Sequence, residues 1–419
     1  MNRLIRRFSH INWALADQGM VSGANFLTGI LLARFLGVEG FGIYTLGWLV
    51  LVFIGSIHTP LVMGAMMSIG PAYSKQDAPK YYGAVLVQNL AVSIAGTLLI
   101  GVGVYLTGLL VPEWGIQQLL WPLVIATFAS MWQEFFRRYF FTRERPALAF
   151  MFDAIRYLGQ IAALFLLFRF SPEGLDSSRA MWITAATAAI AILACPFVMG
   201  KVAWSWHWTR DIAARHYRSS KWPTLSAPLE RVSEYAFYFG AGSLVGSAGV
   251  GALRAAQNMM GIAQILFLGL INVVQIKAAK HYGRDGLAAL SKYLQQVAWM
   301  AGVATAVICL IFAITPAFWL RLFFGEEFVE FGELVRWWAL AYTVNVFVLP
   351  LRSGLRALET TLPIFTSAMF AAIFAVVSAS LVIDWLGLEG AAIGILLSKM
   401  IIVLVMWRGM RRSFVRFSH

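Results

Sequence analysis

Polar side chains follow one another at helical spacing within a stretch of the chain that is otherwise apolar. Arg254, Gln257 and Asn258 are three and four residues apart, so on a helix they share one face. No Asp, Glu, Lys or Arg follows Arg254 until Lys277. A guanidinium beside two amides suits an anionic group such as a phosphate, which it binds through charge-assisted hydrogen bonds. We therefore expect Arg254, at the head of this polar face, to contact an anionic ligand, while hydrogen bonding between helices is the alternative for the face as a whole. The same face continues through Gly261, Gln264, Asn272 and Gln275.

Three other stretches carry polar residues three, four or seven positions apart, so each set also shares a helix face. The sets are Asp17, Gln18, Ser22 and Asn25; Asp153, Arg156 and Gln160; and Glu230, Arg231, Glu234 and Tyr238. For Asp153 and Arg156 we expect packing contacts, that is, hydrogen bonds and ion pairs between helices. For Glu230 with Arg231 or Glu234, packing and a functional role both stay open. We include Asp17, Asn25 and Glu234 with Arg254 in the expected substrate-binding set.

The composition places these polar faces inside a membrane. The 419 residues are 60% hydrophobic and 13% charged, with a mean hydropathy of +0.72. A soluble domain needs a more highly charged exterior than this composition supplies. Stretches without any Asp, Glu, Lys or Arg, such as 83–112 and 360–383, are long enough to cross about 30 Å of hydrocarbon as helices. A charge near the bilayer centre costs at least about 2.5–3.5 kcal/mol, so the charged residues must face a partner or water.

The hydrophobic pattern predicts twelve membrane-spanning helices joined by short loops. Their approximate ranges are 12–35, 41–70, 82–110, 115–138, 147–169, 180–201, 224–246, 251–277, 291–318, 332–353, 361–384 and 389–409. The connection from Lys201 to Pro223 is basic and rich in Trp, which is typical of a segment in the lipid headgroup layer. We therefore expect an all-α membrane protein with two parallel six-helix bundles around a central cavity. The bundles would comprise 1–200 and 224–419, joined by a basic amphipathic linker, 201–223.

Basic residues are unevenly distributed between the two ends of these helices. Most of the 33 Lys and Arg residues fall on the loops that share one side with both termini. The loops of the opposite side carry Arg34, Arg169, Arg179 and Arg321. By the positive-inside rule, both termini are expected in the cytoplasm. The net charge of +13 follows from this distribution and favours contact with anionic membrane lipids. We expect no nucleic-acid partner, because no soluble basic domain is present.

A cluster of three glycines recurs once in the chain, each time between the first and second helix of its half. A shift of 209 residues superimposes the triplets Gly37, Gly40, Gly42 and Gly246, Gly249, Gly251. The same shift places Tyr73 on Tyr282 and Lys75 on Arg284. A duplicated six-helix unit keeps both halves in one orientation, as in transporters built from parallel repeats. Glycine permits positive φ and close helix packing, so we expect tight reversals that can also act as hinges or gates.

The chain lacks the motifs of soluble active sites. The glycine spacing is G-x-x-G-x-G rather than G-x-G-x-x-G, and no strand precedes it, which disfavours a dinucleotide site. Walker A, H-E-x-x-H and G-x-S-x-G sequences are absent. We expect no metal and no cofactor, while coupling to H⁺ or Na⁺ stays open. We expect His58, Cys195 and Cys309 to be core residues, and the acidic stretch "GEEFVEFGE" (Gly325 to Glu333) to be a solvated face.

Three stretches resemble one family of membrane proteins. They are "LLARFLGVEGFGIYTLGWLV" after the first span, "GAGSLVGSAGVGALRAAQNMMGIAQILFLGLINVVQIKAAKHYGRDG" in the seventh and eighth, and "LGLEGAAIGILLSKMIIVLVMWR" in the last. They look like polysaccharide transporters of the O-antigen flippase group. This group belongs to the multidrug/oligosaccharidyl-lipid/polysaccharide (MOP) exporter superfamily. The resemblance covers essentially the whole chain, without the longer fourteen-span layout of lipid II flippases.

The resemblance implies two six-helix bundles in a V shape, alternating access, and a cationic cavity lined by helices 1, 2, 7 and 8. It implies a substrate that is an isoprenoid-pyrophosphate-linked oligosaccharide, moved to the outer leaflet of a bacterial inner membrane for lipopolysaccharide or exopolysaccharide biosynthesis. It gives Arg254, Gln257 and Asn258 the pyrophosphate-facing role. Helix 1 has no matching arginine, since Asp17 and Asn25 stand there. Arg34, whose counterpart in the second half is a serine, is a candidate exit-side contact. Expected partners are the lipid-linked oligosaccharide, membrane lipids and polysaccharide-assembly proteins.

Three alternatives stay open at this point. A multidrug or cation antiporter of the same superfamily would depend on Asp17, Glu230 or Glu234. A membrane glycan polymerase or ligase would need a large outer loop with catalytic residues, whereas the predicted outer loops are short. A scaffold for a polysaccharide export complex would bind partners without transport. We expect a transporter rather than an enzyme.

Overall fold

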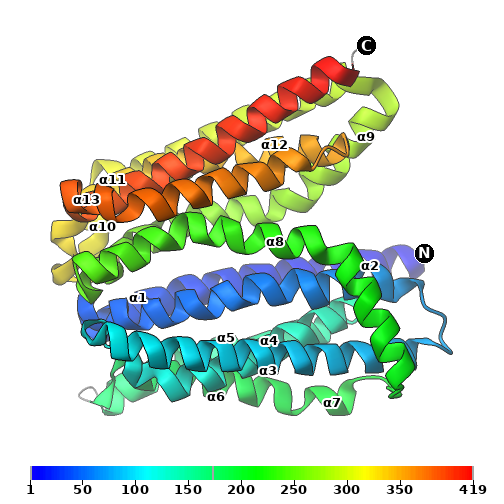
Figure 1. Ribbon diagram of the computed structural model, residues 1–419, viewed down its shortest axis with the longest axis horizontal. Helices are drawn as coiled ribbons and strands as arrows, with labels where there is room; N and C mark the ends of the chain where they lie inside the picture. The colour runs from blue at the N-terminus through cyan, green and yellow to red at the C-terminus, as the bar shows by residue number, and fades with distance from the viewer. Residues whose placement is uncertain (1, 172–173, 418–419) are drawn as a thin grey trace. The chain divides into compact units, whose positions relative to one another are not determined.

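Figure 1 shows the computed structural model of the chain, which describes residues 2–171 and 174–417. The side chains of residues 2–11, 264–273 and 417 lie outside this description. Gln264 and Asn272, which extend the predicted polar face beyond Arg254, are therefore outside the described side chains. Every regular element of the described residues is a helix, which confirms the all-α prediction.

The first part of the chain forms long helices connected by short turns. They are α1 (Asn2–His58), α2 (Ala65–Ile69), α3 (Ala78–Leu110), α4 (Leu120–Thr142), α5 (Pro146–Phe170), α6 (Ser177–Leu193) and α7 (Cys195–Val198). A π-helical segment, Thr59–Gly64, joins α1 to α2 and contains Pro60 near its start. Proline lacks an N–H for the helical ladder, so a widened turn at this position has a local cause.

The second part of the chain contains α8 (Trp206–Leu244), α9 (Ser247–Ile314), α10 (Pro316–Phe323), α11 (Gly332–Asn345), α12 (Val348–Ala357) and α13 (Leu362–Phe417). A 3₁₀ segment, Glu326–Phe331, precedes α11. Helix α8 begins in the predicted basic linker and continues through Pro223 and Pro228. The linker and the span that follows it are therefore parts of one helix rather than separate elements.

Three of the long helices reverse direction at a glycine. Gly37 in α1, Gly286 in α9 and Gly387 in α13 have φ values of 68°, 73° and 59°. These values lie in the left-handed region, which glycine adopts without the steric cost that other residues pay. Figure 1 shows the chain doubling back at each point. Eight stretches of the described residues are long and apolar enough to cross a membrane, and three of them, Asn12–Ala72, Val274–Ile314 and Leu362–Arg416, contain such a reversal.

The chain divides into two compact units. The first comprises Met1–Leu36 and Ile43–Pro228, and the second comprises Gly37–Gly42 and Leu229–His419. The first half of α8 thus belongs to the first unit and its second half to the second unit. Residues Gly37–Gly42 form the turn after the first predicted span. They belong to the second unit, although the helical segments before and after them belong to the first unit.

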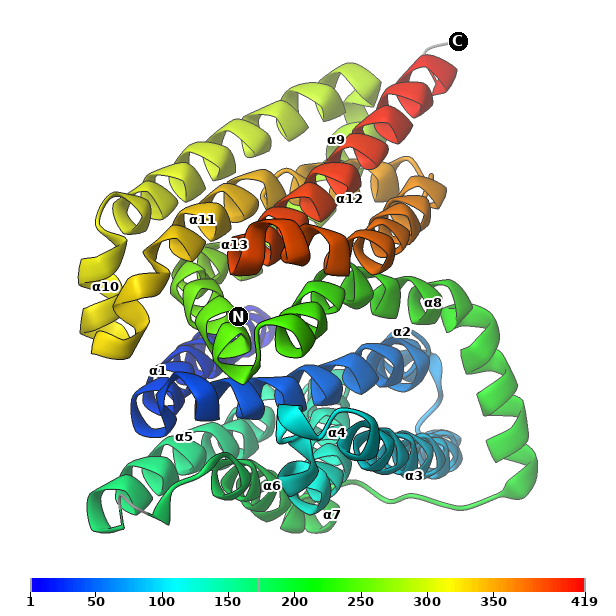
Figure 2. The same cartoon turned by 60° about the vertical axis from the view of Figure 1, so that its left-hand side comes forward.

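Aromatic side chains of α3, α4 and α5 dominate one core cluster of the first unit, and Figure 2 shows these three helices. The largest buried members are Tyr81, Tyr82, Phe135, Phe136, Tyr139, Phe140 and Phe152. Ile212 of α8 packs into the same cluster, and the Tyr81 hydroxyl lies 3.0 Å from Nε2 of His216. The basic segment of α8 is therefore docked on the first unit through its buried face.

The core of the second unit is mainly aliphatic. Helices α9, α12 and α13 contribute Leu290, Leu355 and Met406, all fully buried. Trp338 of α11 is 1% exposed and is the bulkiest of the fully buried side chains among the described residues. These contacts fix the helices that carry the polar residues of the second unit.

Candidate functional site

One polar network of the second unit joins three helices around the side chain of Glu234. Lys399 Nζ of α13 donates to Glu234 Oε2 at 2.8 Å, and Gln257 Nε2 of α9 donates to Glu234 Oε1 at 2.5 Å. Gln257 Oε1 accepts from Arg254 Nη1 at 2.6 Å and from the Tyr238 hydroxyl at 2.9 Å. We call these five residues the Glu234 network. Its carboxylate is linked to one cation directly and to a second through an amide.

The Glu234 network is largely removed from solvent. Glu234 is 9% exposed and the Lys399 side chain is 16% exposed. Tyr238 is fully buried, with its ring centroid 6.4 Å from that of Trp338. Arg231 is exposed and lies three residues before Glu234 on α8, so it adds a cation on the same helix face. The network itself contains two cations, Arg254 and Lys399, and one carboxylate, so it has an excess of positive charge to which the neighbouring Arg231 adds.

The structure brings together three of the residues predicted to bind substrate. Arg254, Gln257 and Glu234 belong to one hydrogen-bonded network, although Arg254 and Glu234 come from different helices. Asn258 follows Gln257 on α9 and is half-buried, as are Arg254 and Gln257. Arg254 is therefore not fully enclosed by the network that it belongs to.

Sequence reasoning missed Lys399 as a site residue. A clear signal was present, because Lys399 is the only Asp, Glu, Lys or Arg between Glu389 and Arg408. A single charge in an apolar span is the same signal that singled out Arg254. The sequence does not show that Lys399 pairs with Glu234, because these two residues are 165 positions apart.

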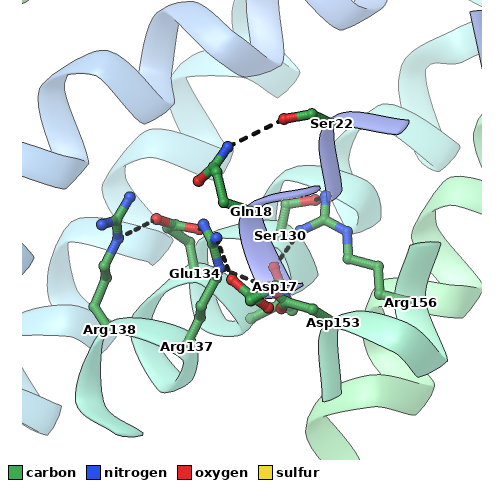
Figure 3. A network of polar contacts seen from close by, with 10 residues as sticks. Asp17, Gln18, Ser22, Ser130, Glu134, Arg137, Arg138, Asp153 and Arg156 are labelled. Carbon is green, nitrogen blue, oxygen red and sulfur yellow. Dashed lines mark hydrogen bonds and ion pairs between the residues drawn. The ribbon is translucent and has the colours of Figure 1, made fainter. Parts of the chain in front are cut away.

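A second polar network lies in the first unit, where α1, α4 and α5 meet (Figure 3). Arg137 of α4 contacts two carboxylates from other helices: its Nη2 lies 2.7 Å from Asp17 Oδ2 and its Nε lies 2.6 Å from Asp153 Oδ2. Both aspartates are fully buried and the Arg137 side chain is 11% exposed. We call this group the Arg137 network. It holds three helices together through opposite charges in a membrane-embedded core.

Neighbouring side chains complete the Arg137 network. Glu134 accepts from Arg138 Nε at 2.6 Å and lies 3.5 Å from Arg137 Nη1. Gln133 donates to Asp153 and accepts from Arg156, and Arg156 Nη2 donates to Ser130 at 3.0 Å (Figure 3). Asp153 and Arg156 make packing contacts, as the sequence predicts, but with Arg137 and Gln133 rather than with each other. Three carboxylates face three arginines here, so the charges balance.

The remaining predicted binding residues of the first unit do not join one cluster. Asp17 is buried against Arg137, whereas Asn25 and Arg34 of the same helix are exposed. Asp17 and Asn25 therefore lie in a different unit from Arg254. Their place in one substrate site with Arg254 stays a prediction.

Glu230 does not belong to the Glu234 network. Its Oε1 lies 2.7 Å from Nη2 of Arg352 in α12, and both side chains are about one-third exposed. The two glutamates of α8, one helical turn apart, thus have separate partners. Glu230 thus makes a packing contact with α12, and a functional role for the two glutamates stays a prediction.

The two glycine turns share a backbone conformation. Gly37 has φ 68° and ψ −179°, and Gly246, its counterpart 209 residues later, has φ 96° and ψ 178°. A residue with a Cβ avoids this region, so both positions require glycine. Gly286 and Gly325 have similar values, so this conformation is general to the tight reversals of this chain.

The glycine turns also approach each other closely within the second unit. A Cβ on Gly42 would overlap the carbonyl oxygen of Ser247, and a Cβ on Gly251 would overlap the carbonyl oxygen of Val38. Gly249 is buried against Leu388, and Gly40 is half-buried. Glycine at positions 42 and 251 therefore allows two backbones to pack in contact, which is the role of small residues between membrane helices.

The acidic segment that follows α10 supports this turn. Glu327 is exposed, as the sequence predicts, yet its Oε2 accepts from the backbone N–H of Val38 at 3.2 Å. The ring of Phe328, buried beside it, lies 6.5 Å from the ring of Phe41. The segment is therefore more than a solvated face, because one of its carboxylates fixes the backbone beside Gly37.

His58, Cys195 and Cys309 are buried, which confirms the prediction that they are core residues. His58 Nε2 lies 2.7 Å from Asn89 Oδ1, and His58 is 1% exposed. Cys195 and Cys309 are both buried and unpaired. These residues need no further role.

Comparison with known protein families matches residues 225–381 to the family MatE. This region begins in α8 and ends in α13, so it includes Glu234, Gln257 and Arg254. The match spans less than half of the chain. No curated protein matches the sequence.

Solved structures with the same fold cover nearly the whole chain. One is a multidrug resistance MATE family transporter of the MOP superfamily in an inward-facing conformation. It is 15% identical, with a TM-score of 0.79 over 96% of this chain and 94% of that one. Another is the lipid II flippase MurJ in an inward closed conformation, which is 12% identical, with a TM-score of 0.77 over 97% and 90% of the two chains. The chain therefore has the fold of MOP-superfamily transporters.

Proposed function

We propose that this protein, which has the fold of the MOP transporters, is a flippase for an isoprenoid-diphosphate-linked oligosaccharide. It moves this lipid from the cytoplasmic to the outer leaflet by alternating access and so supplies surface polysaccharide biosynthesis. The fold supports transport in general, and the charge of the Glu234 network supports this class of substrate.

The single observation that carries the proposal is the excess of cations in the Glu234 network. Arg254 and Lys399 are linked to one carboxylate, Glu234, in a part of the molecule that is largely buried, and the exposed Arg231 lies beside them on α8. Guanidinium and ammonium groups bind phosphate oxygens strongly where water is scarce. A diphosphate that links two organic groups carries a negative charge on each phosphate, which matches the local excess.

A multidrug or cation antiporter is the second candidate function. Its support is the first solved structure above and the buried carboxylates of the Arg137 network. Asp17 Oδ1 has no hydrogen-bond partner among the described residues, so it is a place where a proton or a metal cation can bind. Against this function, each carboxylate of that network faces an arginine, and no excess of negative charge attracts a cationic drug.

The same proposal places the protein in a bacterial inner membrane with both termini in the cytoplasm. Its support is the concentration of Lys and Arg on one side of the predicted spans. Labelling of single cysteines at Arg34 and Lys75 in intact cells tests this orientation. The position 34 variant should react with an impermeant reagent, and the position 75 variant should react only after lysis.

Deletion of the gene tests the function in the cell. The deletion strain should accumulate lipid-linked oligosaccharide that faces the cytoplasm, and should lose surface polymer. Wild-type protein should restore export, whereas an Arg254→Ala variant expressed at the same level should not. Unchanged surface polymer without such accumulation would rule out this substrate class. Loss of cationic-dye efflux instead would favour the antiporter.

A further inference from the structure

Glu234 makes the contacts that a phosphate group would make. One carboxylate oxygen accepts from the ammonium of Lys399 at 2.8 Å, and the other accepts from the amide of Gln257 at 2.5 Å. Ammonium and amide N–H groups are also donors to phosphate oxygens. The residue that neutralises the site is therefore chemically similar to the ligand proposed for it.

The side-chain amide of Gln257 forms hydrogen bonds with both an anion, Glu234, and a cation, Arg254. Its nitrogen donates to Glu234, while its oxygen accepts from Arg254 Nη1 at 2.6 Å. Removing Glu234 from this position leaves the Gln257 N–H and the Lys399 ammonium without their acceptor. A buried cation that loses its partner is costly, so an entering anion would recover the lost interaction.

Two arginines at the network, Arg231 beside it and Arg254 within it, are more exposed than Glu234. Arg231 is exposed and Arg254 is half-buried, whereas Glu234 is 9% exposed. An anion can therefore first contact the two arginines and then compete with Glu234 for Lys399.

We propose that Glu234 is the internal counter-anion of the diphosphate site. Its carboxylate occupies Lys399 and Gln257 while the site is empty, and the substrate's diphosphate displaces it on binding. This inference rests on the proposed function, because it assumes that the ligand is a diphosphate. It assigns Lys399 to the binding site and makes Glu234 a residue that weakens substrate binding.

Binding of farnesyl diphosphate to the purified full-length protein tests this assignment. Glu234→Gln should bind the probe about tenfold more tightly than wild type, a change of about 1.4 kcal/mol, because the competing charge is gone. Lys399→Gln should bind it about tenfold more weakly. In the Lys399→Gln background, Glu234→Gln should increase the affinity for the probe much less, because Glu234 no longer competes for the Lys399 ammonium.

Glu230→Gln is the matched control. It removes the same charge from the same helix one turn away, but its partner is Arg352 rather than Lys399. A general electrostatic effect would raise affinity in both glutamine variants, whereas displacement of a counter-anion raises it in Glu234→Gln alone. If Glu234→Gln folds poorly, Glu234→Asp keeps the charge but cannot span both donors, and it should bind several-fold more tightly.

The outcomes separate this inference from the proposed function. If wild type binds the probe and Arg254→Ala weakens binding, but Glu234→Gln binds equally or less tightly, Glu234 is a structural partner of Lys399 and the inference is wrong. If wild type and all variants fail to bind the diphosphate, the proposed substrate class is wrong and the inference falls with it.

Discussion

Gly42 and Gly251, which are 209 residues apart, occupy equivalent places in a reciprocal contact. A Cβ on Gly42 would lie 3.0 Å from the amide nitrogen of Gly251, and a Cβ on Gly251 would lie 3.1 Å from the amide nitrogen of Gly42. Each would overlap the carbonyl oxygen at the equivalent neighbouring position, Ser247 or Val38. The repeated turns therefore pack through the same atoms, as self-complementary patches do around a two-fold axis.

Replacing either glycine by alanine should damage the protein. In Gly42→Ala the methyl group meets a backbone oxygen, which cannot move as a side chain can, so we expect a loss of about 1–3 kcal/mol in stability. Thermal unfolding in detergent measures this loss. Gly103→Ala in α3 is the control, since a Cβ there meets nothing within 4 Å. Equal unfolding temperatures for the two variants would contradict the close contact.

Removing Arg137 should destabilise the first unit more than removing a neighbouring arginine. Arg137→Leu leaves Asp17 and Asp153 buried without their cation, and such a loss typically costs about 3–5 kcal/mol. Arg138→Leu is the matched control, because the Arg138 side chain is 34% exposed and pairs with Glu134 rather than with either aspartate. Thermal unfolding and the yield of folded protein compare the two. Equal losses would show that the Arg137 network does not hold the helices together.

Asp17 gives a separate test of ion coupling. Asp17→Asn keeps the shape of the side chain but cannot take up a proton or carry a charge. If the Arg137 network only joins helices, transport by this variant should keep its dependence on H⁺ or Na⁺ gradients. Transport measured with and without each gradient decides this. Loss of the gradient dependence with folding intact would assign coupling to Asp17.

Acid should weaken the docking of the basic segment of α8. Burial, with Arg215 nearby, lowers the pKa of His216 from about 6.5 to about 4. Between these values a solvent-exposed His216 binds a proton and the docked one does not, so docking weakens as the pH falls from about 6.5 to 4. The loss amounts to up to about 3 kcal/mol. Hydrogen exchange of residues 206–222 measures this change.

His216→Gln and His207→Gln separate docking from other acid effects. Glutamine at 216 can still bond to Tyr81 but does not titrate, so exchange in this variant should be nearly independent of pH between 4 and 6.5 after correction for the intrinsic rate. His207 is exposed, with its side chain 82% accessible, and His207→Gln should behave as wild type. Equal pH dependence in all three proteins would exclude His216 as the cause.

The sequence contains most of the information about the fold. Hydropathy and the distribution of charge predict apolar helices, and the glycine spacing predicts reversals at Gly37 and Gly246. Both features are local, because a run of apolar side chains or a positive φ acts on the segment that contains it. The continuity of α8 through Pro223 was not predictable in this way, since proline usually marks a boundary.

The site was less predictable because its contacts are long-range. The pattern identified Arg254, Gln257 and Glu234 as polar residues on helix faces, but spacing within a helix does not show which other helix supplies a partner. Lys399 pairs with Glu234 across 165 residues, and Arg137 pairs with Asp17 across 120. Neither pairing can be inferred from a single sequence.

Flipping in reconstituted vesicles tests the central claim most directly. Purified protein is inserted into liposomes with a fluorescent isoprenoid-diphosphate-linked oligosaccharide, and the fraction of lipid reached by an external quencher is followed with and without H⁺ or Na⁺ gradients. Wild type should accelerate transfer between leaflets, and Arg254→Ala and Lys399→Gln should slow it at least about tenfold. The account would be contradicted if transfer of the lipid were no faster than in empty liposomes under every gradient while the protein transported cationic dyes.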